Sequence, residues 1–205
     1  MHVFVETNYI LELAFQQEDY LACERILAGA QARRYTLHVP HYALAEVFEV
    51  LRRKRHNRAE HQTYVLQEVQ QHLREADADA PNLDSLVQLL INLLQARTQA
   101  QTSRVFDLVA RLTEVAPGPA LTAAIVREAE VAQSRYGLEA QDALVWASVL
   151  AGLRELPPAQ PKLLVTRNDS DFKKPDIIEA LRSLNCHLIA NFRAAADRLA
   201  QGTRG

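Results

Sequence analysis

Residues 2–15 read HVFVETNYILELAF, and this stretch decides the fold class. Val3–Val5 is a short apolar run without alternation, which is typical of a strand covered on both faces. Glu6 follows the run directly, and a helical pattern extends from about Asn8 to Phe15. A buried strand that passes at once into a helix indicates the start of an alternating α/β chain.

The same kind of run recurs three times along the 205-residue chain, and further strands are predicted at Leu37–Val39, Leu163–Val165 and His187–Ile189. Helical stretches separate these strands. Since strands that alternate with helices form parallel sheets covered on both faces, we expect an α/β fold. Its predicted architecture is a three-layer α/β/α sandwich with a short parallel sheet.

Helices are predicted at about 19–32, 41–55, 120–136 and 139–153. The middle of the chain, about 58–111, is rich in Gln, Leu and Ala, and its three- and four-residue spacing predicts two or three helices broken near Pro81. We interpret it as a helical insertion in a single domain that covers 1–205. A leucine stripe at Leu86–Leu94 is interpreted as domain core, with an oligomer interface as the alternative. A short strand is expected near Leu112–Val115.

Composition excludes several classes of protein. Hydrophobic residues make up 48% and charged residues 23%, and the formal net charge is −2, so nucleic acid would be bound through local patches only. Two cysteines cannot form a disulfide framework or a four-cysteine zinc site, and they fit a reducing compartment. No apolar run is long enough to span a bilayer, and no signal peptide is recognised, so we expect a cytoplasmic protein without a membrane partner.

Acidic residues follow two of the predicted strands. Glu6 comes directly after the first strand, and Asp169 and Asp171 come shortly after Leu163–Val165. In an open parallel sheet, ligands bind beyond the carboxyl ends of the strands, so these acids could meet there. The alternative is that they only cap turns and helices, for which Asp and Asn are well suited.

Two further acids lie on predicted helices. Glu46 falls at the rim of an apolar helix face, and Asp142 begins a helix that is apolar nearly all round. A simpler explanation exists for each: Glu46 could pair with Arg53 in solvent, and Asp142 could complement the helix dipole. Carboxylates that converge on one pocket raise one another's pKa, and a divalent cation such as Mg²⁺ or Mn²⁺ removes that conflict. Such a cation can also promote hydrolysis of a phosphodiester.

Four segments of the chain together resemble the PIN-domain nucleases, the fold of toxin ribonucleases. These segments are VFVETNYILEL (3–13), VPHYALAEVFEVL (39–51), QDALVWASVLAG (141–152) and LLVTRNDSDF (163–172). The resemblance implies a metal-dependent endoribonuclease that hydrolyses RNA phosphodiester bonds with Mg²⁺ or Mn²⁺, as the toxin of a toxin–antitoxin pair. The partners it implies are RNA, an antitoxin protein and a second copy of the chain in a dimer.

The resemblance also implies roles for individual residues. The catalytic residues would be Glu6, Glu46, Asp142 and Asp171; the metal ligands would be Glu6, Asp142, Asp171 and Asp169; and Thr7, Asn8, Thr166 and Asn168 would support them. Two positions depart from the family pattern: Glu6 stands where Asp is usual, and Asn168 stands where some relatives carry Asp. We favour Asp171 as the last carboxylate, with Asn168 and Asp169 as alternatives.

Basic residues flank the acids on two segments, and the expected phosphate contacts are Arg52, Arg53, Arg55, Arg167 and Lys173. The alternative is that such residues only offset helix dipoles and solvate the surface. A different class of function also stays open, since Glu6 in place of Asp is compatible with a catalytically weak or inactive PIN-fold module for RNA binding or assembly. A third alternative is an enzyme that acts on a small phosphorylated molecule.

Overall fold

The computed structural model describes residues 1–74 and 80–201. The chain forms two compact units. The first combines Met1–Val47 with Asp107–Gly205, and the second is Phe48–Phe106. The first unit carries the sheet and the predicted acids, and the second unit is helical.

Within the described residues, the sheet has four parallel strands in the order β2-β1-β3-β4. These are β1 (His2–Val5), β2 (Thr36–His38), β3 (Lys162–Val165) and β4 (Cys186–Ile189), each within one residue of its predicted bounds. Val5 pairs with Val165, and Val165 pairs with Ile189. Since β1, β3 and β4 end level with one another, the residues that follow them share one edge of the sheet.

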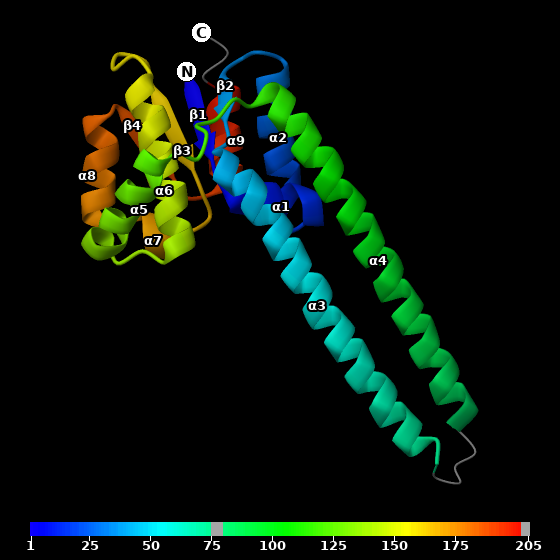
Figure 1. Cartoon of the computed structure of the whole chain (residues 1–205). Coiled ribbons are helices and arrows are strands. Elements are labelled where there is room, and N and C mark those ends of the chain that lie inside the picture. The colour runs from blue at the N-terminus through cyan, green and yellow to red at the C-terminus, as the bar shows by residue number, and fades with distance from the viewer. Residues whose placement is uncertain (75–79, 202–205) are drawn as a thin grey trace. The chain divides into compact units, whose positions relative to one another are not determined.

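Helices cover both faces of the sheet, as Figure 1 shows. One layer contains α1 (Thr7–Phe15), α2 (Tyr20–Gln31) and α9 (Phe192–Gln201), and the other contains α5 (Ala123–Tyr136), α6 (Ala140–Glu155) and α8 (Pro175–Ser183). The short α7 (Asp169–Phe172) follows β3. Phe4 and Leu164 pack with Trp146 on the α6 side, and Tyr9 contacts Phe192 on the other. The predicted three-layer α/β/α sandwich is confirmed.

A tight loop fixes the start of α3 (His41–His72), the helix that carries Glu46. Gly118 lies against the end of β2, where an added Cβ would come within 1.7 Å of the Val39 carbonyl oxygen. Only glycine permits this approach. The His41 N–H also donates to the Pro119 carbonyl at 3.2 Å, so this loop anchors the first turn of α3.

The second unit consists of the facing parts of α3 and α4 (Ala80–Val115). Val69, Val87 and Ile91 form its buried cluster, and Arg58 donates to Thr98 at 2.9 Å and to Gln101 at 2.7 Å. Because these contacts pair the later part of α3 with the early part of α4, the two helices form an antiparallel hairpin. None of the described helices is both long and apolar enough to cross a membrane.

Three sequence-based expectations for this region are wrong. The helix expected to end near Arg55 continues to His72, because Leu66 and Val69 contribute to the hairpin contact. No strand forms at Leu112–Val115; Leu112 is buried as part of the last turns of α4. The stripe Leu86–Leu94 is not domain core, since its leucines are exposed.

Candidate acidic site at the carboxyl edge of the sheet

Glu6 joins the end of β1 to the start of α1 and caps that helix. One carboxylate oxygen, Oε2, accepts the Asn8 backbone N–H at 2.7 Å, and Oε1 accepts the Thr166 hydroxyl at 2.9 Å. Only 4% of the residue is exposed. Since Thr166 directly follows β3, the carboxylate ties the ends of two neighbouring strands together.

Burial raises the pKa of Glu6 to about 7, and the negative charge of Glu46 acts in the same direction. The hydrogen bonds from Asn8 and Thr166 lower the pKa but do not offset the loss of solvation. A carboxyl group that titrates near neutral pH beside a second acid is typical of functional sites.

Glu46 reaches the same region from α3. The Thr7 hydroxyl donates to its Oε2, so the residue after Glu6 holds the second acid. Glu46 is half-buried, as its predicted position at the rim of the apolar face requires. Thr7 therefore links the start of α1 to α3.

Asp142 and Asp171 form a second acidic pair. Asp142 lies in the first turn of α6, and its pKa is raised by partial burial and then by the charge of Asp171. Its Oδ1 accepts the side-chain amide of Asn168 at 3.0 Å. The Lys174 ammonium lies 3.6 Å from Asp171 and offsets part of this negative charge.

A short chain of hydrogen bonds connects the two acidic pairs. The backbone N–H of Asn168 donates to the Thr166 hydroxyl oxygen at 2.9 Å, and that hydroxyl donates to Glu6. The amide side chain of the same Asn168 holds Asp142. The side-chain amide of Asn168 therefore acts as a hydrogen-bond donor to a carboxylate. An Asp at position 168 could not donate this bond unless it were protonated.

Both acidic pairs act on Tyr42, whose pKa is raised by burial and then by the charges of Glu46 and Asp142. From the sequence, Tyr42 is expected to pack in the core, with stacking on an RNA base as the alternative, and the structure packs it against the core cluster. Its position four residues before Glu46 on the same helix face was the available signal.

The donor chemistry of these acids fits a hard divalent cation, because carboxylates that raise one another's pKa carry excess negative charge that a cation offsets. In the part of the chain that the structure describes, no three His, Cys, Asp or Glu side chains are grouped closely enough to hold a metal ion. The acids are arranged instead as two pairs, Glu6 with Glu46 and Asp142 with Asp171, whose members act on each other through their charges.

Comparison with protein families identifies the family of the chain. A family model described as PIN domain matches residues 3–172, which is well over half of the chain and spans all four acids. The chain belongs to the PIN domain family. PIN domains are generally nucleases, so a nuclease-type function follows for this one. No curated protein and no solved structure matches the chain in the corresponding comparisons.

Asp169 of this PIN domain lies apart from the two acidic pairs. It is exposed and forms an ion pair with Lys173 at 2.5 Å. It lines a cavity of about 450 Å³ together with Arg167 and Arg193. Asp169 and Lys173 therefore neutralise each other's charge. In this segment it is the charge of Asp171 that raises the pKa of Asp142.

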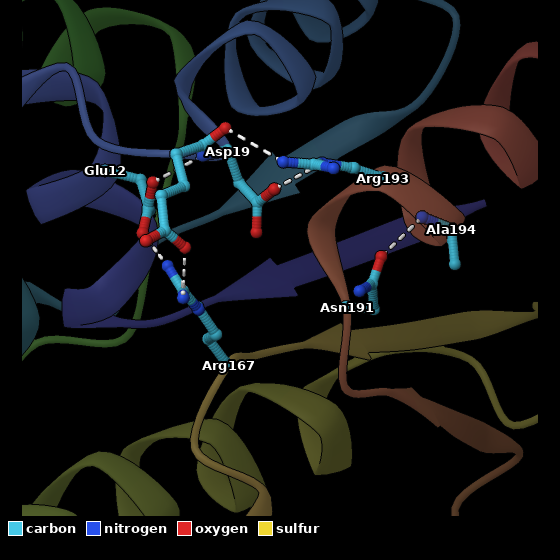
Figure 2. A network of polar contacts seen from close by, with 7 residues as sticks. Glu12, Asp19, Arg167, Asn191, Arg193 and Ala194 are labelled. Atoms are coloured by element: carbon cyan, nitrogen blue, oxygen red, sulfur yellow. Dashed lines mark hydrogen bonds and ion pairs between the residues drawn. The ribbon is translucent and has the colours of Figure 1, made fainter.

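Arg167 is held in the polar network that Figure 2 shows. Its guanidinium pairs with the buried Glu12 and, at 2.9 Å, with Glu18. Beside it, Arg193 donates to Asp19 at 2.6 Å. Arg167 thus fixes the loop after β3 to α1, whereas a contact with phosphate would require it to leave two carboxylates.

The remaining predicted phosphate contacts belong to the second unit. Arg52 forms a pair with Glu49 through two hydrogen bonds, of 2.8 and 2.6 Å. Arg53 and Arg55 are exposed on the same helix.

Proposed function

We propose that this PIN domain is a divalent-metal-dependent endoribonuclease that hydrolyses RNA phosphodiester bonds. One observation carries the proposal: four acids come from separate segments and act on one another near one edge of the sheet. Hydrogen bonds through Thr7, Thr166 and Asn168 hold Glu6, Glu46 and Asp142, and the charge of Asp171 acts on Asp142. The raised pKa values of Glu6 and Asp142 support it, because clustered negative charge attracts a cation.

Mg²⁺ or Mn²⁺ would be held by the carboxylates of Glu6, Glu46, Asp142 and Asp171. When bound, the cation supplies a Lewis acid to the scissile phosphate and charge to stabilise the transition state. Asp169 is left out of this set because it pairs with Lys173 in solvent.

The supporting residues would fix the acids before substrate arrives. Thr166 holds Glu6, Thr7 holds Glu46 and Asn168 holds Asp142, so three of the four proposed ligands have a neutral donor on one oxygen. Such donors orient ligands without adding charge.

RNA cleavage by the Asp142→Asn variant tests the proposal. The wild-type chain, given Mn²⁺ or Mg²⁺ and a structured RNA, is expected to cleave at least about 100-fold faster than the variant, because the substitution removes one carboxylate from the second pair. Asp169→Asn is the matched control and is expected to leave cleavage unchanged. Equal rates for wild type and Asp142→Asn would refute the mechanism.

The alternative is a catalytically inactive PIN-fold module for RNA binding or assembly, and it is favoured by the lack of three grouped metal ligands among the described residues. This alternative predicts that wild type binds RNA without cleaving it and does not bind Mn²⁺ at millimolar concentration. The role of toxin in a toxin–antitoxin pair rests on the four resembling segments.

A further inference from the structure

The helical hairpin of the second unit leaves one apolar face of α4 uncovered. The leucines of this face are between 38% and 64% exposed, and they are Leu83, Leu86, Leu89, Leu90, Leu93 and Leu94. Their three- and four-residue spacing places them along one side of the helix over about three turns. We call this set the leucine face.

The hairpin cannot cover the leucine face itself. The side of α4 that contacts α3 presents Val87 and Ile91, which are buried against Val69. Leu86 and Leu93 lie about 100° to 120° around the helix from Val87, at 100° per residue. They therefore point away from the contact with α3, and Leu86 is the most exposed of the six.

The charge on this segment favours association with an identical surface. Residues 85–96 read SLVQLLINLLQA and contain no charged side chain. In a contact between two identical faces, each residue meets its own copy or a neighbour of it, so any charge on the face would repel its equivalent. The leucine face carries no such penalty over these twelve residues.

The exposed area also matches what a stable dimer buries. If a fully exposed leucine side chain presents roughly 150 Å², slightly less than an aromatic one, the leucine face offers about 450 Å². Two such faces remove about 900 Å² of apolar surface from water. A standard interface buries about 1,200–2,000 Å² in total, of which about 65% is apolar in homodimers.

We propose that two copies of this chain associate through the leucine face, hairpin against hairpin. Two antiparallel helix pairs that meet through apolar stripes form a four-helix bundle, which would enlarge the small core that Val69, Val87 and Ile91 form in each hairpin. This interface is built from the helical insertion and does not depend on the proposed nuclease activity.

Sedimentation equilibrium of the full-length chain tests the proposal. At micromolar concentration, wild type is expected to sediment as a dimer of the 23.1 kDa chain. Leu86→Lys combined with Leu93→Lys is expected to be monomeric, because four ammonium groups would be buried in the interface. The control is Val131→Lys, which alters a residue that is 63% exposed on α5 and is expected to remain dimeric.

Two results would overturn the proposal. The first is a monomeric wild type at about 50 μM, well above the Kd of a standard interface, which would leave the leucine face to a different partner. The second is a dimeric double lysine variant with the far-ultraviolet circular dichroism of wild type. Leu90→Cys provides a second readout, since native Cys23 and Cys186 are buried. A short bismaleimide is expected to cross-link this variant into dimers and to leave a Val131→Cys variant monomeric on denaturing gels.

Discussion

The surroundings of the Glu6 carboxyl group shift its pKa in opposite directions. Hydrogen bonds from Asn8 and Thr166 favour its anion, whereas burial and the neighbouring Glu46 favour its protonated form. Burial dominates, and the pKa of about 7 lies well above the ordinary value of 4.5. One carboxylate oxygen of Glu6 caps α1 while the other accepts the Thr166 hydroxyl.

This pKa predicts that stability depends on pH. The folded chain keeps the proton of Glu6 up to about pH 7, whereas the unfolded chain releases it near 4.5. The stabilisation is therefore fully present below pH 4.5 and is lost as pH rises through 7, with a total on the order of 3 kcal/mol. Urea unfolding of wild type and Glu6→Gln at pH 5 and pH 8 measures it.

The expected result is that wild type loses stability between pH 5 and pH 8 relative to Glu6→Gln, which has no proton to release. Parallel pH profiles for the two proteins would contradict a buried, proton-binding Glu6. Other groups titrate in both proteins alike, so the difference between the profiles isolates this residue.

At the scale of elements, the loop between β3 and α7 determines the geometry of the acidic site. It carries Thr166 and Asn168, which hold Glu6 and Asp142. Arg167 lies between these two residues and binds the loop to Glu12 of α1. The ion pair thus positions the donors of both acidic pairs.

Replacing Arg167 by Ala is predicted to destabilise the fold by about 2–3 kcal/mol, because buried Glu12 would lose its cationic partner. Urea unfolding at neutral pH measures the loss. Arg25→Ala breaks an exposed pair with Asp197 and is expected to cost less than about 1 kcal/mol. Equal stability of the two variants would contradict the claim that the ion pair between Glu12 and Arg167 holds the loop after β3 in place.

The sequence was sufficient to predict the strands, because each is a short apolar run bounded by polar residues. It was also sufficient to identify acids that follow strands or begin helices, since parallel topology brings such positions to one edge. The catalytic role of Glu6, Glu46, Asp142 and Asp171 remains a prediction. The Glu12–Arg167 pair could not be foreseen, because it joins residues 155 positions apart whose types alone do not specify a partner.

The spacing of apolar residues along α4 also did not determine which of them are buried. Leu86–Leu94 has the same spacing whether it faces a core or solvent, and only the placement of Val87 and Ile91 against α3 shows which side is covered. The segment predicted as a strand at Leu112–Val115 reads LTEV, and its two β-branched residues favour a strand, but it forms the end of α4.

At the scale of the whole molecule, the chain combines a PIN sandwich with a helical hairpin that carries exposed basic residues. Replacing Arg53 and Arg55 together by Ala is predicted to weaken RNA binding and to reduce the slope of log K against log salt by about 1 to 2. Filter binding in EDTA at several salt concentrations measures this effect.

Arg52→Ala is expected to change the slope less, since Arg52 is engaged with Glu49. Mn²⁺ binding should be the same in these variants as in wild type. An unchanged slope for the double variant would remove Arg53 and Arg55 from the RNA contacts.

Calorimetric titration of the chain with Mn²⁺ tests the central claim most directly, since it asks whether the four acids form one cation site. We predict that wild type binds Mn²⁺ with submillimolar affinity at pH 8 and more weakly at pH 6, where Glu6 holds its proton. Asp142→Asn is expected to bind at least about tenfold more weakly than wild type. Asp169→Asn is expected to bind as wild type does. No heat of binding at millimolar Mn²⁺, or equal affinity of wild type and Asp142→Asn, would contradict the account.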